Sequence, residues 1–174
     1  MSDRVSRTIL LCEDELHERL ARAYMERCGL SARPPLLFPL VASRMQHGGN
    51  VDWVLREFPK QLYACRQRQK KARTLLIVLV DADKFAVDER RRQLDARLTQ
   101  AGYEALHETD PVVLLIPRRH VETWICSLLG KAVTEDEDCK DWDKPTRAEI
   151  RQAAHTVYQW AARMPHLALP AFRR

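Results

Sequence analysis

Long hydrophobic runs are missing from this sequence of 174 residues. No apolar run reaches the roughly 18–20 residues that a membrane-spanning helix requires, and residues 1–4 lack the apolar stretch of a signal peptide. We therefore expect a cytoplasmic protein without a membrane partner. Because a single core typically takes about 100–150 residues, we expect residues 1–174 to form one domain.

Several motifs of well-known enzyme classes are also absent. The sequence has no G-x-x-x-x-G-K-S/T for P-loop ATP binding, no G-x-S-x-G nucleophile elbow and no H-E-x-x-H zinc-protease motif. Any ATPase that works with this protein would have to be a separate partner. The five cysteines are odd in number and include no C-x-x-C pair of the kind that zinc sites favour. We expect reduced thiols, several of them buried.

Positive charge exceeds negative charge in this chain. There are 29 Lys and Arg against 24 Asp and Glu, which gives a net charge of +5 and a pI near 9.1. Most of the cations are arginines, whose guanidinium groups bind phosphate oxygens in bidentate fashion. The composition favours a polyanionic partner such as nucleic acid. We expect DNA rather than RNA. We interpret the basic clusters at residues 66–73 and 90–92 as helix faces exposed to water.

Apolar runs predict the strands. Residues 8–12, 74–80 and 112–116 are short, continuous and rich in Ile, Leu and Val, which is typical of strands buried on both faces. Residues 34–42 are apolar but interrupted by proline, which indicates an edge strand or an extended segment.

Helices are predicted between these strands. The first follows residue 12 and ends at Gly29; the second spans residues 51–72, with Asn50 as its cap and a bend at Pro59. Others are expected at residues 87–101, ended by Gly102, and at 121–129 and 145–164. Residues 131–174 would thus comprise an acidic loop, a helix and an irregular tail. Alternating strands and helices predict an α/β fold, a doubly wound and mostly parallel sheet with helices on both faces.

Carboxylates follow two of the predicted strands. Glu13 comes directly after the first strand, and Asp81 and Asp83 come after the strand at residues 74–80. In an extended chain, Asp81 and Asp83 would point to the same side, and Glu13 would join them if the two strands are neighbours. Mg²⁺ prefers such oxygen ligands, and nucleases use two ions about 4 Å apart to cut phosphodiesters. The sequence therefore predicts a site for Mg²⁺ or Mn²⁺ at this edge of the sheet.

Three motifs resemble Toprim-like proteins. They are Leu11-Cys12-Glu13-Asp14-Glu15-Leu16-His17-Glu18, Val80-Asp81-Ala82-Asp83 and Ile116-Pro117-Arg118-Arg119-His120-Val121-Glu122-Thr123-Trp124. The likeness is strongest to small stand-alone relatives of the nuclease domain of overcoming-lysogenization-defect proteins, found in anti-phage systems. It implies a Rossmann-like sheet, Mg²⁺-dependent nuclease activity, metal ligands at Glu13, Asp81 and Asp83, and a partner ATPase.

The same resemblance implies that Glu122 and Trp124 lie beside the metal site. Glu122 has an alternative interpretation as a first-turn glutamate that complements the helix dipole, and Trp124 has one as a core residue. The chain departs from the family pattern at Asp14, where relatives have glycine, and around His17 and Glu18. A helix presents only one of those two residues towards the strand edge, and the spacing from Glu13 favours His17.

Basic residues flank the predicted carboxylate site. Lys84 follows the Asp pair and is a candidate to neutralise phosphate charge, with a solvated loop lysine as the alternative. We expect Arg118, Arg119 and His120 to contact nucleic acid.

Two other classes of function remain open. The acidic segment at residues 13–15 also resembles the first-strand motif of receiver domains, in which Asp81 would accept a phosphoryl group. Receivers need a Lys-Pro after a late apolar strand, whereas Lys144-Pro145 here follows an acidic loop. The second alternative is an inactive nuclease-derived subunit that binds nucleic acid or protein. A homodimer that binds duplex DNA is also left open.

Overall fold

The sheet of this protein has four parallel strands in the part of the chain that the structure describes. The computed structural model describes residues 5–29, 36–45, 51–69, 71–139 and 144–163. The strands are β1 (Arg7–Cys12), β2 (Leu37–Val41), β3 (Thr74–Leu79) and β4 (Val112–Leu115), in the order β2-β1-β3-β4. Cys12 pairs with both Val41 and Leu79, and Leu79 pairs with Leu115, so all four carboxyl ends meet at one edge.

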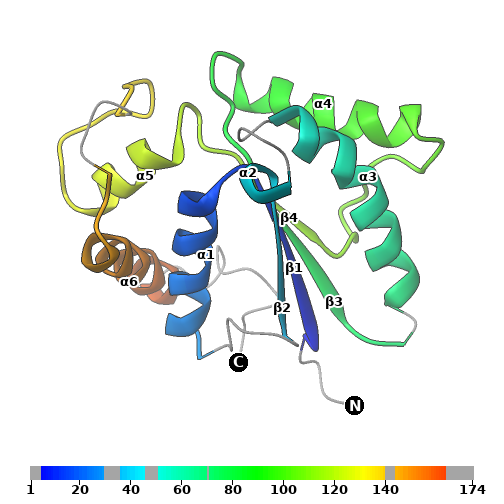
Figure 1. Ribbon diagram of the computed structural model, residues 1–174, viewed down its shortest axis with the longest axis horizontal. Coiled ribbons are helices and arrows are strands. Elements are labelled where there is room, and N and C mark those ends of the chain that lie inside the picture. Colours follow the sequence, from blue (N-terminus) through cyan, green and yellow to red (C-terminus); the bar gives the residue numbers. More distant parts are fainter. Residues whose placement is uncertain (1–4, 30–35, 46–50, 70, 140–143, 164–174) are drawn as a thin grey trace.

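Helices cover both faces of this sheet, as predicted. Helices α3 (Val51–Arg68) and α4 (Val87–Gln100) lie on one side, and α1 (Glu15–Arg27), α5 (Val121–Leu128) and α6 (Arg147–Arg163) lie on the other (Figure 1). The short helix α2 (Ala42–Met45) directly follows β2. The α/β class with a parallel, Rossmann-like sheet is therefore confirmed.

Alternate residues of the central strands enter two separate cores. Ile9 and Leu11 of β1 pack in the core that holds α3 and α4, whereas Leu10 and Cys12 pack in the core on the α1 side. Strands buried on both faces need apolar residues at every position, which explains the continuous runs in the sequence. A third cluster joins α1, α5 and α6 through Leu20, Ala23, Val121, Ile125, Ile150, Ala153 and Ala154.

Most predicted boundaries agree with the structure to within two residues. β2 is an edge strand, in keeping with Pro39 inside it, and Gly29 and Gly102 adopt the left-handed conformation that ends the preceding helices. Helix α3 includes Pro59 and ends at Arg68, four residues earlier than predicted. None of the five cysteines forms a disulfide, and four of them are buried. The predicted Asn50 cap and the tail at residues 165–174 lie outside the described residues.

The prediction that residues 66–73 form a water-exposed face is wrong for Arg66. This side chain is only 16% exposed and forms a bidentate pair with Asp110, at 2.7 Å from Nε to Oδ1 and 2.6 Å from Nη2 to Oδ2. It also donates to the backbone oxygens of Glu104 and Ala105. Arg66 therefore fastens the end of α3 to the loop that leads into β4.

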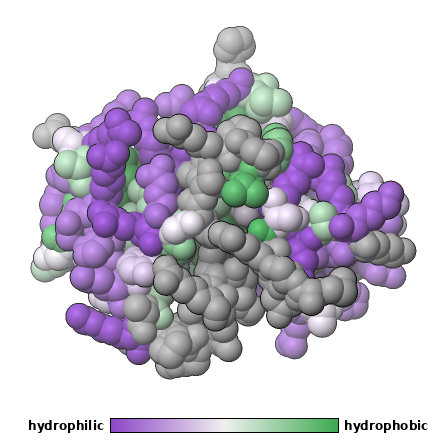
Figure 2. All heavy atoms as spheres, turned by 90° about the horizontal axis from the view of Figure 1, so that it is seen from below, coloured by the Kyte–Doolittle hydropathy of each residue, from purple (hydrophilic) through white to green (hydrophobic). Residues whose placement is uncertain are grey.

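The amino-end face of the sheet is largely hydrophilic where it is described. Figure 2 views this face from below and shows hydrophobic residues only in small, separate areas. Among the described helices, none combines the length and the apolar character needed to cross a membrane.

Candidate metal centre

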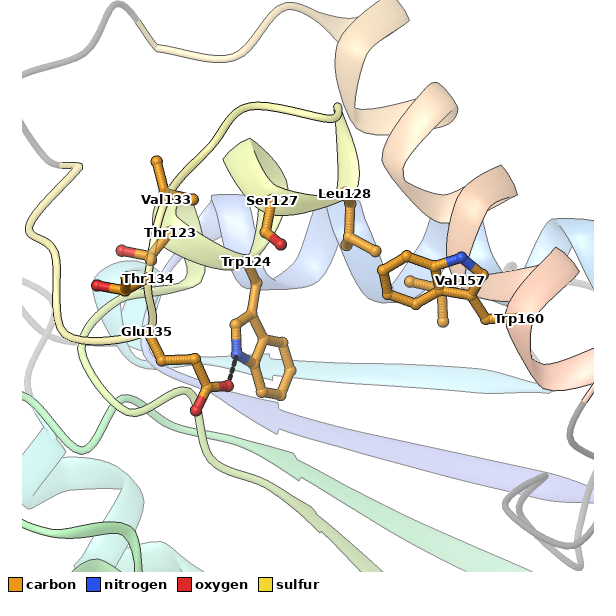
Figure 3. A pocket seen from close by; sticks show the side chains of 9 residues that line it. All are labelled: Thr123, Trp124, Ser127, Leu128, Val133, Thr134, Glu135, Val157 and Trp160. Atoms are coloured by element: carbon orange, nitrogen blue, oxygen red, sulfur yellow. Dashed lines mark hydrogen bonds between the residues drawn. The ribbon is translucent and has the colours of Figure 1, made fainter.

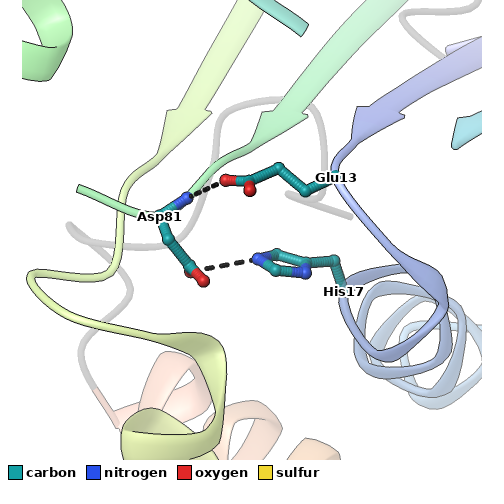
Figure 4. Close-up of side chains that lie close together, drawn as sticks. All are labelled: Glu13, His17 and Asp81. Carbon is teal, nitrogen blue, oxygen red and sulfur yellow. Dashed lines mark hydrogen bonds and ion pairs between the residues drawn. The ribbon is translucent and has the colours of Figure 1, made fainter. Parts of the chain in front are cut away.

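The carboxyl edge of the sheet brings Glu13 and Asp81 together. Because β1 and β3 are neighbours in register, the residues that follow them meet, and the backbone N–H of Asp81 donates to Oε1 of Glu13 at 2.7 Å (Figure 4). Burial and the nearby Asp81 carboxylate raise the pKa of Glu13 to about 7, against the opposing effect of His17. The Glu13 carboxylate is thus held against β3.

Asp83 approaches Asp81 through a turn, and the predicted extended chain is wrong here. Asp83 has a φ of 55°, in the left-handed region, and the N–H of Phe85 donates to the oxygen of Ala82. Few residues adopt this conformation readily, although Asp and Asn do so more often than others. The turn still places one oxygen of each aspartate within the same small cluster, with ligand atoms no more than 4.8 Å apart.

Arg90 holds this turn, and the prediction that it faces water is wrong. Its side chain is 2% exposed, and it donates to the backbone oxygens of Asp81 at 3.0 Å and Ala82 at 3.3 Å. It also lies 3.5 Å from Oδ2 of Asp83 and sits over the ring of Phe85. The neighbouring Arg91 and Arg92 are exposed, as predicted. The buried guanidinium of Arg90 therefore donates hydrogen bonds to backbone oxygens of the turn.

His17 links the first helix to the central carboxylate. Its Nδ1 lies 2.8 Å from Oδ1 of Asp14, which caps α1, and its Nε2 lies 3.0 Å from Oδ1 of Asp81 (Figure 4). Burial alone would lower the pKa of His17, but the hydrogen bonds to Asp14 and Asp81 raise it to about 10. Burial would raise the pKa of Asp14, but the hydrogen bond from His17 lowers it to about 2. His17 is therefore an imidazolium that donates to two carboxylates.

His120, the residue directly before α5, approaches the same aspartates from the β4 side of the sheet edge. Its Nδ1 lies 3.6 Å from Oδ2 of Asp81 and 3.5 Å from Oδ1 of Asp83, and its Nε2 lies 3.6 Å from Oδ2 of Asp138. The side chain is 8% exposed, and its Nδ1 is buried with no hydrogen-bond partner among the described residues. A buried nitrogen in this state is costly unless something outside the protein satisfies it.

The donor set of Asp81, Asp83 and His120 fits a divalent cation. Adjacent ligands of an octahedral ion with bonds near 2.1 Å lie about 3 Å apart, so small movements would bring these atoms into coordination. In histidines that bind metals, the other ring nitrogen commonly donates to a carboxylate. Asp138 is the carboxylate beside the other ring nitrogen of His120. By contrast, His17 in the second group, with Glu13 and Asp81, already has both ring nitrogens occupied. We therefore identify Asp81, Asp83 and His120 as the group that could hold a metal ion.

Two acidic residues predicted for the site lie outside both groups. Glu18 is buried, but it pairs with Arg22 at 2.7 Å and Arg44 at 2.6 Å and does not face Asp81. Glu122 is half-buried in the first turn of α5 and belongs to neither cluster. Its position agrees with the alternative interpretation, a glutamate that complements the dipole of its own helix.

Three predicted basic residues surround a small cavity beside Asp83. Lys84, Arg118 and Arg119 line it together with Phe85 and Ala86, and its volume is about 90 Å³. Arg118 donates to Oδ1 of Asp136 at 2.5 Å, and Arg119 donates to the backbone oxygens of Asp136 and Asp83. His120, predicted to contact nucleic acid, is instead buried among carboxylates. The sequence did not reveal this role, because the carboxylates around His120 come from segments that meet only in the folded protein.

Trp124 belongs to a different part of the surface. It packs against the core on the α1 side, and its Nε1 donates to Oε1 of Glu135 at 3.3 Å. It lines a cavity whose volume is about 280 Å³. Figure 3 shows the other lining residues, which are Thr123, Ser127, Leu128, Val133, Thr134, Glu135, Val157 and Trp160. None of the candidate metal ligands lines this cavity.

The chain has no significant match among protein-family models, curated proteins or solved structures.

Proposed function

We propose that this protein is a metal-dependent nuclease that hydrolyses phosphodiesters of nucleic acid, with DNA favoured as the substrate. Asp81, Asp83 and His120 would hold the ion. The observation that carries the proposal is the buried, unpartnered Nδ1 of His120, which faces two carboxylates while Asp138 lies behind it. A divalent ion between the three side chains would satisfy this nitrogen and balance the charge of the two carboxylates.

The ion proposed for this site is Mn²⁺ or Mg²⁺. Two carboxylates suit both ions, whereas the imidazole nitrogen favours Mn²⁺, because Mg²⁺ takes oxygen ligands and keeps several waters. When bound, the ion would polarise the phosphodiester, activate the attacking water and stabilise the leaving oxygen.

Other residues of this chain would bind the phosphate and position the metal ligands. Lys84, Arg118 and Arg119 form a cationic rim beside Asp83, suited to the negative oxygens of a phosphate. His17 would keep Asp81 in place by binding the Asp81 carboxylate. Glu13 would do so by accepting the backbone N–H of Asp81. The side chain of Asp81 is 8% exposed and that of Asp83 is 37% exposed, so substrate would approach from the Asp83 side.

The burial of Asp81 favours this proposal over the receiver alternative. A phosphoacceptor aspartate needs a carboxylate that its phosphodonor can reach. Both carboxylate oxygens of Asp81 face histidine nitrogens, one at 3.0 Å from His17 and the other at 3.6 Å from His120. A Toprim-like nuclease in an anti-phage system, working with a separate ATPase, remains the context that we propose from the sequence motifs.

The test is cleavage of supercoiled plasmid, linear DNA and RNA with Mn²⁺, Mg²⁺ or EDTA. Wild-type protein should cut in the presence of metal, and Asp83→Asn and His120→Ala should each lower the rate by at least 100-fold. Asparagine also tolerates the left-handed conformation at position 83, so the first variant keeps the fold. The matched controls are Asp88→Asn and His107→Ala, at exposed positions outside both clusters. A folded wild-type protein that cuts no substrate would contradict the proposal.

A further inference from the structure

A groove between α1 and α6 is lined mainly by arginines. Its volume is about 380 Å³, and its lining consists of Arg19, Arg22, Ala23, Glu26, Arg147, Ile150 and Arg151. We call this the arginine groove. Four guanidinium groups thus face one hollow that holds a single carboxylate, that of Glu26.

The two arginines on α6 make no ion pair with any described residue. Arg147 and Arg151 are both exposed and lie one turn apart on the helix. On α1, Arg19 pairs with Glu15, and Arg22 shares Glu18 with Arg44. The groove therefore keeps an excess of positive charge that the described side chains do not neutralise.

The first turn of α6 places an arginine at the groove. Arg147 is the first residue of this helix. Thr146 and Glu149 form a reciprocal capping pair, in which each backbone N–H donates to the other side chain. This cap fixes where α6 begins, so it also fixes the position of Arg147 at the groove.

Helix α1 contributes both to the arginine groove and, through His17, to the surroundings of the candidate metal centre. Arg19 comes two residues after His17, and Arg22 comes five residues after it, a rise of about 7.5 Å along the helix axis. A polymer bound at the metal centre would have to continue across neighbouring surface, and this helix leads from the one site to the other.

We propose that the arginine groove binds the sugar–phosphate backbone of a nucleic acid at phosphates away from the cleaved bond. Guanidinium forks bind phosphate oxygens in pairs, and the two apolar lining residues, Ala23 and Ile150, offer little surface for a protein helix. The inference rests on the proposed function in one respect, because the bound polymer is taken to be the substrate. Contacts of this kind position the polymer and do not read its sequence.

The experiment compares binding of a fluorescein-labelled 20-mer, as duplex DNA, single-stranded DNA and RNA, in EDTA to prevent cleavage. The variant is Arg147→Gln/Arg151→Gln. Loss of two phosphate contacts should weaken binding at least tenfold at 0.1 M salt for the preferred oligonucleotide. The plot of log K against log salt, which falls as salt rises, should also become less steep by about 1.8 for a duplex. Thermal unfolding should be unchanged, because both residues are exposed.

The matched control is Arg68→Gln/Lys71→Gln, which removes two exposed cations near the amino end of β3. It should bind the oligonucleotide within twofold of wild type. Equal weakening of binding in both double variants would contradict the proposed role of the arginine groove. So would wild-type affinity in Arg147→Gln/Arg151→Gln, or a wild-type protein that binds none of the three oligonucleotides.

A second readout separates this inference from the proposed function. Hydrolysis of bis(p-nitrophenyl) phosphate with Mn²⁺ needs no extended backbone, so Arg147→Gln/Arg151→Gln should retain it. If wild-type protein binds the oligonucleotides through the groove but hydrolyses neither substrate, the nuclease proposal fails and the groove stands.

Discussion

Individual side chains at the carboxyl edge of the sheet carry most of the functional argument. Glu13, Asp81 and Asp83 follow buried strands, and this position in the sequence predicts that they meet. The place of His120 in the site could not be predicted in the same way, because its neighbours Arg119 and Val121 do not indicate which carboxylates it meets. Arg90 was missed for a related reason, since a run of three arginines on a helix predicts exposure.

Arg90 offers a test of how the aspartate turn is held. Lysine at this position would reach fewer acceptors, leaving backbone oxygens of Asp81 and Ala82 buried without donors. We expect Arg90→Lys to lower the free energy of unfolding by about 1–3 kcal/mol, as measured by urea denaturation. Arg91→Lys, at an exposed neighbour, should change it by less than about 0.5 kcal/mol. Equal stability of the two variants would show that Arg90 does not support the turn.

Glu122 distinguishes the family resemblance from the geometry. The resemblance implies that this glutamate acts beside the metal, whereas the structure places it in neither cluster. We expect Glu122→Gln to bind Mn²⁺ within twofold of wild type and to retain most of the plasmid cleavage. A loss as large as that of Asp83→Asn would show that Glu122 joins the site when metal and substrate are bound.

At the scale of helices and strands, the sequence predicted what depends on continuous local patterns. The runs in β1, β3 and β4 were long enough to identify, and Pro39 correctly indicated an edge strand. The four-residue helix α2 was missed because one turn leaves no periodic pattern. The turn at Asp83 was missed because the residue with the left-handed conformation is not a glycine, the residue that usually indicates such a turn. Both features depend on tertiary contacts that follow folding.

The link between α3 and β4 predicts a pH-dependent contribution to stability. Burial would raise the pKa of Asp110, but the hydrogen bonds from Arg66 lower it below its usual 3.8. A group whose pKa is lowered on folding stabilises the protein above its unfolded pKa and loses that contribution as the pH falls through the folded value. Asp110→Asn should therefore cost about 1–3 kcal/mol at pH 7 and less at pH 3.

Urea denaturation of wild type and Asp110→Asn at both pH values measures this difference. The exposed Asp88→Asn provides the control, because it should cost little at either pH. A cost for Asp110→Asn that is the same at pH 3 and pH 7 would contradict an ionised Asp110–Arg66 pair.

At the scale of the whole molecule, the fold gathers acidic and basic side chains into distinct clusters. Acidic ligands lie at the carboxyl edge, a cationic rim of Lys84, Arg118 and Arg119 lies beside Asp83, and the arginine groove lies along α1. Composition predicted a polyanionic partner, but the net charge of +5 could not show where that partner binds. The arrangement depends on α6 packing against α1, a contact between segments more than 100 residues apart.

Metal binding to the whole protein is the measurement that tests the central claim most directly. Calorimetric titration of metal-free wild-type protein with Mn²⁺ should show saturable binding, and His120→Ala and Asp83→Asn should each weaken it at least tenfold. His107→Ala, at an exposed histidine, should bind as wild type does. If wild-type protein takes up no Mn²⁺, or if both site variants bind it with wild-type affinity, then Asp81, Asp83 and His120 do not form a metal centre.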